Sequence, residues 1–345
     1  MKTIISVISE DNINDEEIKK AGEIIKAGGL VAFPTETVYG LGGDALNPES
    51  SKKIYAAKGR PSDNPLIVHI AKKEDLYKIA EDVSENAEAV MDAFWPGPLT
   101  LIFKKKSVVP YETTGGLDTV AVRFPVHKVA AEFIKASGGF VAAPSANLSG
   151  RPSPTLAKYV IQDMDGRVDM IIDGGNIPIG LESTIVDMTS DSPMILRPGF
   201  VSKEMLEEVI NQVNVDPTIL DSNCKERPKA PGMRYRHYAP KADMLIVRGE
   251  AGKVAAEINR LSKEKENCAV ICAKEHVHMY EGMTVKNVGS LEDYDEIASN
   301  IYRVLRECDD ENVSYILSES FSDKGIGAAL MNRLIKAAGH NIIDV

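Results

Sequence analysis

Two cations and an amide stand close together in the segment AKGRPSDNPL, residues 57–66. Lys58 and Arg60 are two positions apart, so on extended backbone their side chains would point to the same side. The two prolines of the segment bar a helix across it, which predicts a rigid loop that holds both cations and Asn64 in place. Ammonium and guanidinium groups neutralise phosphate oxygens, and arginine can do so with two hydrogen bonds. The segment alone fits a phosphate-binding loop and a solvated basic turn about equally well.

Hydroxyl and basic side chains recur at the ends of several predicted strands. Loops that follow the strands of an open α/β sheet are where such sheets bind ligands. Arg123 lies among apolar residues in the predicted strand 119–124, so it needs an anionic partner, either an ion pair or a ligand. The recurrence predicts a single anion-binding cleft to which these residues contribute: Thr35, Arg60, Arg123, Ser145, Ser183 and Arg197.

Other polar positions allow two interpretations. His69 stands among apolar residues in the predicted strand 66–70, where a histidine is more often a core residue than a functional one. The loop 143–155 is rich in serine and asparagine and can bind a phosphate or ribose, or be a plain polar loop. The run of two arginines, a histidine and two tyrosines in 234–238 indicates a segment that folds back over the cleft, or an exposed linker.

Length and composition predict two α/β domains. A chain of 345 residues exceeds one ordinary core, and 43% apolar content is typical of globular packing. Strands and helices alternate in residues 1–205 and again in 243–345, which predicts a smaller, doubly wound second domain. The segment 206–242 loses this periodicity and contains several prolines, so we expect a linker.

Charge and hydropathy narrow the class of protein. A net charge of −11 disfavours broad, non-specific binding of nucleic acid by the whole surface. The sequence contains no run of 18 apolar residues, so it predicts no membrane span. The first residues lack a signal-peptide pattern, and we therefore expect a cytoplasmic protein.

The four cysteines favour buried thiols over a disulfide or a metal site. Cys268 and Cys272 share a predicted strand and would lie about 13 Å apart, which is too far for a disulfide. No histidine or second cysteine pair stands at the spacing of a zinc site. The sequence also contains no P-loop, no GxSxG and no HExxH, so a nucleotide-binding pocket here would be of an unusual type.

Several motifs together resemble the Sua5/YrdC/YwlC family of L-threonylcarbamoyladenylate synthases, in its long two-domain form. They are PTETVYGLG, the Lys-x-Arg of AKGRPSDNPL, the Ser-x-Asn of APSANLSG, ESTIVD, RPG and the linker-like APGMRYRHYAP. The resemblance implies a twisted, open, mixed sheet with helices and a concave cleft, followed by a Rossmann-like domain. It also implies a nucleotidyltransferase that converts L-threonine, bicarbonate or CO2, and ATP to threonylcarbamoyl-AMP and pyrophosphate, the first step of t6A formation at position 37 of tRNA.

The resemblance also assigns roles to residues. Lys58 and Arg60 would be catalytic, and Mg²⁺ would be held by ATP phosphates without protein side chains. Tyr235 would cover the nucleotide, with His237 or Tyr238 as alternatives. ATP would be bound by Lys58, Arg60, Asn64, Thr119, Ser145, Asn147, Ser153, Arg197 and Tyr235. Threonine would be bound by Thr35, His69, Arg123 and Ser183.

Two further functions are weighed against this one. Related single domains have a basic concave face suited to RNA, so an RNA-binding module is the alternative, and the resemblance leaves weak tRNA binding open. Carbamoyltransferases of hydrogenase maturation share the catalytic domain type, but they carry CxxC zinc-finger repeats and an acylphosphatase-like domain, and the sequence shows neither. The expected partners are ATP, threonine, bicarbonate and the downstream proteins that transfer threonylcarbamoyl to tRNA.

Overall fold

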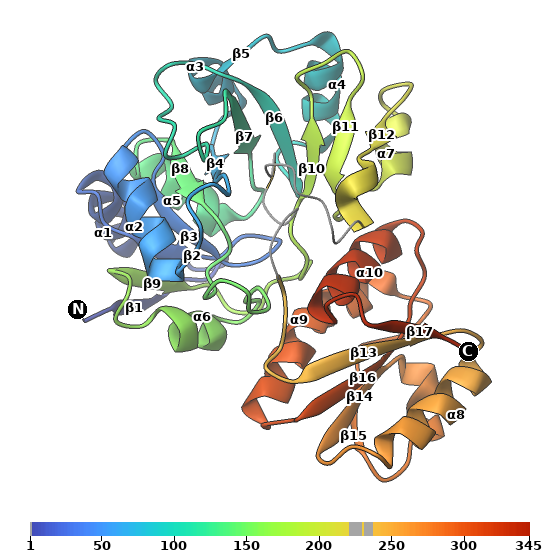
Figure 1. Ribbon diagram of the computed structural model, residues 1–345. Coiled ribbons are helices and arrows are strands. Elements are labelled where there is room, and N and C mark those ends of the chain that lie inside the picture. The colour runs from blue at the N-terminus through green and yellow to red at the C-terminus, as the bar shows by residue number, and fades with distance from the viewer. Residues whose placement is uncertain (1, 221–229, 231–236) are drawn as a thin grey trace. The chain divides into compact units, whose positions relative to one another are not determined.

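The structure, a computed structural model, describes residues 2–220, 230 and 237–345. The chain divides into two compact units, each described here by itself (Figure 1). The first comprises Met1–Ser149, Ser153–Pro178 and Glu182–Arg234, and the second Gly150–Pro152, Ile179–Leu181 and Tyr235–Val345. The predicted domain boundaries at residues 205 and 242 stay predictions, and most of the predicted linker lies outside the described residues. No helix in the described part of the chain is long and apolar enough to cross a membrane.

The first unit is built on a 12-stranded mixed sheet in the order β1-β9-β2-β3-β8-β4-β7-β6-β10-β11-β12, with β5 paired to β6. Its strands are β1 (Ile4–Val7), β2 (Val31–Phe33), β3 (Gly40–Asp44), β4 (Ile67–His69), β5 (Ala80–Glu81), β6 (Leu99–Lys105), β7 (Thr119–Arg123), β8 (Val141–Ala143), β9 (Met170–Asp173), β10 (Thr184–Asp187), β11 (Met194–Arg197) and β12 (Asn214–Val215). Its helices are α1 (Asp15–Lys26), α2 (Pro48–Lys58), α3 (Leu76–Ile79), α4 (Glu85–Phe94), α5 (Lys128–Ala136), α6 (Ala157–Met164) and α7 (Lys203–Glu207), with short 3-10 helices at Lys73–Asp75 and Pro217–Leu220.

Alternation along the strands sends side chains into separate cores on the two faces of the sheet. On β2, Val31 and Phe33 belong to a cluster with residues of α1 and α5, whereas Ala32 between them belongs to a larger cluster that includes residues of α2, α4 and α6. The order Asn14-Asp15-Glu16-Glu17 is typical of a capping box and predicts a helix that begins there. Helix α1 begins at this point, because the side chain of Asn14 accepts hydrogen bonds from the backbone of Glu16 and Glu17.

A third apolar cluster covers one face of the strands β4, β7, β6, β10 and β11. Among the described residues no helix contributes to this cluster, which includes Ala230 from the predicted linker. Because side chains alternate along a strand, His69 and Arg123 point to the same face as the cluster residues that precede them by two positions. The other members are Ile67, Ile102, Ala121, Ile185 and Leu196.

The second unit is a parallel, doubly wound sheet in the order β15-β14-β16-β13-β17, which confirms the predicted fold class. Its elements are β13 (Asp243–Arg248), α8 (Ala251–Ser262), β14 (Cys268–Cys272), β15 (Thr284–Asn287), α9 (Tyr294–Asp310), β16 (Tyr315–Glu319), α10 (Ile326–Ala337), β17 (Ile342–Asp344) and the 3-10 helix Lys274–Met279. Cys268, Cys272 and Cys308 are buried free thiols, as predicted, and Cys224 lies outside the described residues.

Three segments differ from the structure that their residues predict. Glycines after the strand that ends at Phe33 predict a loop, but Gly40–Asp44 form strand β3. A Cβ at Gly42 would lie 2.9 Å from Cγ1 of Val141, so the glycines permit close contact with a neighbouring strand. The residue pattern of 76–94 predicts a single helix, but the chain is broken between α3 and α4, where Asp82 has a φ of 53°. The pattern of 202–213 also predicts a helix, but α7 ends after Glu207.

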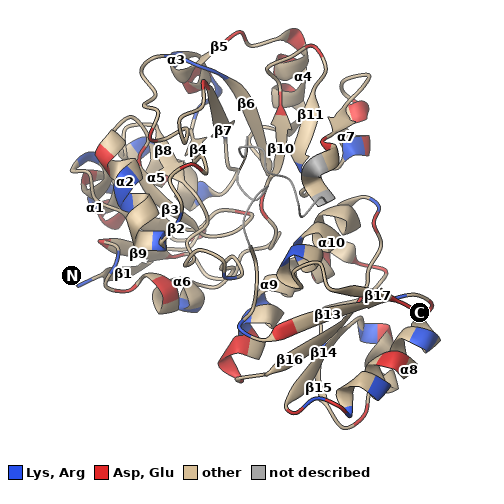
Figure 2. Ribbon diagram, in the orientation of Figure 1, with Lys and Arg blue, Asp and Glu red and all other residues tan. Residues whose placement is uncertain are grey.

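Acidic and basic residues are interspersed along the helices (Figure 2). On α8, the guanidinium of Arg260 lies 2.7 Å from carboxylate oxygens of both Glu257 and Glu264. On α2, Lys52 lies 2.6 Å from Glu49. Pairing of this kind neutralises positive charge locally and does not favour a broad nucleic-acid surface.

Candidate functional site

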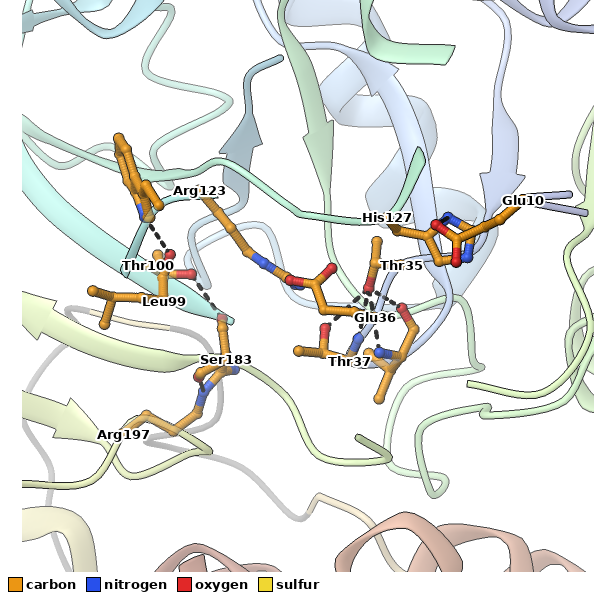
Figure 3. A network of polar contacts seen from close by, with 12 residues as sticks. Glu10, Thr35, Glu36, Thr37, Leu99, Thr100, Arg123, His127, Ser183 and Arg197 are labelled. Atoms are coloured by element: carbon orange, nitrogen blue, oxygen red, sulfur yellow. Dashed lines mark hydrogen bonds and ion pairs between the residues drawn. The ribbon is translucent and has the colours of Figure 1, made fainter. Parts of the chain in front are cut away.

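Arg123 is the buried cation predicted from the sequence, and its partner is Glu36. Nη2 of Arg123 lies 2.8 Å from Oε1 of Glu36, and the two side chains are 5% and 6% exposed (Figure 3). Strand register places Arg123 beside His69 on β4 and beside Thr100 on β6. The ion pair therefore stands at one end of β7, among polar side chains from two neighbouring strands.

The loop that carries Glu36 is fixed by its own hydroxyls. Oγ1 of Thr35 donates to the carbonyl of Val38 at 2.7 Å and accepts from the backbone N–H of Thr37 at 3.2 Å. Such local bonds hold a turn without a helix or strand. Sequence reasoning missed Glu36, although an acidic residue between the two threonines of PTETVYG could have been paired with the buried arginine it had predicted.

A second polar network begins at Thr100, the residue of β6 that lies opposite Arg123. The hydroxyls of Thr100 and Ser183 are 2.7 Å apart, and Nη2 of Arg197 donates to Oγ of Ser183 at 3.2 Å and to its carbonyl at 2.9 Å. The structure thus brings Arg123, Ser183 and Arg197 to one region through Thr100. Thr100 was not identified from the sequence, where it reads as an ordinary strand residue.

Lys58 joins the Lys-x-Arg and Ser-x-Asn motifs. Its Nζ donates to the carbonyls of Ser145 and of Asn147, the latter at 2.5 Å, and Oγ of Ser145 donates to Oδ1 of Asn147 at 2.5 Å. The prediction of an extended loop was wrong for Lys58, which is the last residue of α2. The helix continues to it and ends at Gly59, whose φ is 62°.

Among the remaining predicted ATP residues, Arg60 and Asn64 precede β4 and Thr119 begins β7, whereas Ser153 follows β8 and contacts the residue before Ser183. Nη2 of Arg60 donates to the carbonyls of Asn64 at 3.2 Å and Pro65 at 3.0 Å. Thr119 begins β7, so it lies about 13 Å from Arg123 at the other end of that strand. Oγ of Ser153 donates to Oε1 of Glu182 at 2.6 Å, a partner that sequence reasoning also missed.

The residues predicted to cover the nucleotide are only partly described. Tyr235 lies outside the described residues. Tyr238 is buried in the second unit, where its ring stacks on Tyr302 of α9 with centroids 5.4 Å apart. Nothing in the described part of the chain assigns any of them to the nucleotide, so this role stays a prediction.

Burial keeps the imidazole of His69 uncharged. Desolvation, reinforced by the positive charge of Arg123, lowers the pKa of His69 to about 3. Nδ1 of His69 lies 3.1 Å from the carbonyl of Ile67 on its own strand. A neutral ring can stand beside Arg123 without repelling it.

We expect His69 to make the protein less stable in mild acid. Because its pKa is lower in the folded than in the unfolded chain, the unfolded chain takes up a proton first as the pH falls below about 6.5. Going from pH 7 to pH 5 should cost about 2 kcal/mol of unfolding free energy from this residue. Urea unfolding of wild type and His69→Gln at both pH values measures it, and an equal loss in the two proteins would contradict it.

Known families and proteins match this chain along its length. The family model Sua5_yciO_yrdC, described as telomere recombination, matches residues 23–199. A second model, the C-terminal domain of threonylcarbamoyl-AMP synthase, matches residues 201–339. The chain belongs to the Sua5 family.

Full-length relatives in the Sua5 family agree with this assignment. The chain is 46% identical to threonylcarbamoyl-AMP synthase of Pyrococcus abyssi, with 100% of both chains covered. It is 44% identical to that of Bacillus subtilis, over 99% of this chain and 100% of the relative. The crystal structure of P. abyssi Sua5 complexed with L-threonine superposes with a TM-score of 0.94 at 45% identity, covering 99% of this chain and 100% of the other.

Proposed function

We propose that the chain is a threonylcarbamoyl-AMP synthase, which joins L-threonine, bicarbonate or CO2, and ATP and releases pyrophosphate. The carrying observation is the buried Arg123 beside His69, in a chain 44–46% identical to such synthases along its whole length. Membership of this family makes the protein an enzyme that forms an AMP-linked intermediate for tRNA modification. Within that class we propose that it is a nucleotidyltransferase, that it works in the cytoplasm and that downstream proteins transfer its product to tRNA.

The two ends of β7 support a division of the site between the substrates. We assign threonine to the Arg123 end, with Thr35, His69 and Ser183, because a guanidinium can hold a carboxylate bidentately. We assign ATP to the end where the two motif loops meet, because cations and small hydroxyls suit phosphate and ribose. The ATP group is Lys58, Arg60, Asn64, Thr119, Ser145, Asn147 and Ser153. Arg197, which contacts Ser183 of the threonine group, would extend from there to the phosphates.

The proposed reaction needs positioning more than a protein nucleophile. The amine of threonine adds to CO2 to give a carbamate, whose oxygen attacks the α-phosphorus of ATP as pyrophosphate leaves. Lys58, Arg60 and Arg197 would neutralise the negative charge that develops on the phosphates. Mg²⁺ would enter on the ATP phosphates, and the cations, amides and hydroxyls of the ATP group fit a metal carried by the nucleotide rather than by a carboxylate cage.

A cover over the site would protect the adenylate from water. Ala230, from the middle of the predicted linker, is fully buried and packs with Ile67, Ala121 and Ile185 on the face of the sheet that carries Arg123. This contact supports our proposal that the segment 206–242 folds over the cleft.

Pyrophosphate release in the presence of ATP, Mg²⁺, bicarbonate and threonine tests the function. We expect release to require threonine and bicarbonate, and the product to be an adenylate detectable by mass spectrometry. Release that ignores threonine would reject the proposal. Tight tRNA binding without any threonine-dependent release would favour the RNA-binding alternative instead.

A further inference from the structure

The ion pair between Glu36 and Arg123 is buried and poorly satisfied. Apart from the 2.8 Å contact between them, neither carboxylate oxygen of Glu36 has a hydrogen-bond partner among the described residues, and nor do Nε and Nη2 of Arg123. Both side chains are at least nine-tenths buried. Groups that are charged, buried and without hydrogen bonds are costly to hold, so a ligand that completes them would be bound favourably.

The imidazoles near the pair add no charge of their own. Burial lowers the pKa of His127, against the raising effect of Glu10 and Glu36, and the pKa of His69 is about 3. Both rings are therefore neutral at pH 7. The charges of this region therefore come from the ion pair, which has one negative charge on Glu36 and one positive charge on Arg123.

We propose that Glu36 binds the ammonium group of the amino-acid substrate while Arg123 binds its carboxylate. This rests on the proposed function and deepens it, because it assigns the residue that recognises a free α-amine. An amino acid is a zwitterion, so its two charges can replace the partner that each residue has in the ligand-free protein. The exchange leaves no buried charge unpaired and keeps the pocket neutral overall.

The same exchange makes the pocket selective. A carboxylate without an amine can displace Glu36 from Arg123 only by leaving Glu36 buried and unpaired. An amine without a carboxylate can pair with Glu36 only by leaving the guanidinium of Arg123 buried and without an anionic partner. Penalties of this kind discriminate more strongly than missing apolar contacts do.

Isothermal titration of the full-length protein with two ligands tests the proposal. L-Threonine carries both charges, and (R)-3-hydroxybutyrate keeps the carboxylate and the hydroxyl but lacks the amine. We expect wild type to bind threonine at least about 100-fold more tightly than (R)-3-hydroxybutyrate. We expect Glu36→Gln to weaken threonine binding on the order of 100-fold and to leave or improve the binding of (R)-3-hydroxybutyrate.

Glu10→Gln is the matched control. It removes a carboxylate on the other side of His127, 3.7 Å from its Nδ1, and should leave threonine binding unchanged. If Glu36 only supports Arg123, Glu36→Gln would weaken both ligands equally, and the proposal would be overturned. Comparable affinity of wild type for the two ligands would overturn it without any variant, even if Glu36→Gln failed to fold.

These outcomes are separate from failure of the proposed function. If the protein makes no threonine-dependent pyrophosphate, the function is wrong whatever Glu36 does. If it makes pyrophosphate but does not discriminate between the ligands through Glu36, only the assignment of Glu36 is wrong.

Discussion

Arg123→Gln should abolish measurable threonine binding and destabilise the fold. Removing one member of a buried charge pair costs several kcal/mol of ligand binding, and it leaves the carboxylate of Glu36 without its 2.8 Å partner. We expect a loss of about 3–5 kcal/mol in the free energy of unfolding. Threonine titration and urea unfolding of the same preparation measure the two effects.

The double variant Glu36→Gln with Arg123→Gln separates these effects. Two neutral amides can hydrogen-bond to each other, so most of the lost stability should return. Threonine binding should not return, because the carboxylate has no cation to meet. Recovery of threonine binding in the double variant would show that the carboxylate is held elsewhere.

Arg60→Ala should remove activity and leave the fold intact. The Arg60 side chain is half-buried, and its described bonds go to two backbone carbonyls of its own loop, so the stability change should stay within about 1.5 kcal/mol. Loss of a charge-stabilising group should lower the rate of pyrophosphate release by about 100- to 1,000-fold. Threonine binding measured without ATP should be unaffected, because Arg60 belongs to the proposed ATP group.

Lys52→Ala is the appropriate control for Arg60→Ala. Lys52 is a cation of the same basic stretch, but it is exposed on α2 and paired with Glu49. Its removal should leave the rate unchanged. Full turnover by Arg60→Ala, or an equal loss in both variants, would show that the loop does not act on the phosphates.

The sequence predicted best where local patterns decide the structure. The cap at Asn14, the buried thiols of β14 and the need of Arg123 for an anion follow from residue type and near neighbours. Strand β3 could not be predicted in this way, because its glycines matter through Phe33 and Val141, which meet them from other strands. Such contacts depend on the completed sheet.

The candidate site shows the same limit. Lys58, Ser145 and Asn147 stand in recognisable motifs, but nothing local indicates that the ammonium of Lys58 bonds the carbonyls of the other loop. Thr100 has no unusual neighbours in sequence and becomes a candidate only when the fold brings it beside Arg123. Glu36 stands in a recognisable motif, but only the fold identifies it as the partner of Arg123.

The buried cysteines allow opening of the second unit to be measured by alkylation of their thiols. Residues 2–220 contain no cysteine, whereas burial raises the pKa of Cys272 and of Cys308 to about 12. Since the thiolate is the reactive form, an alkylating reagent must wait for transient opening of the second unit. With Cys224 replaced by serine, the labelling rate would therefore track opening of that unit alone. Repeating the measurement with threonine and ATP, which we propose bind to the first unit, would show how much ligand binding there changes the free energy of opening of the second unit.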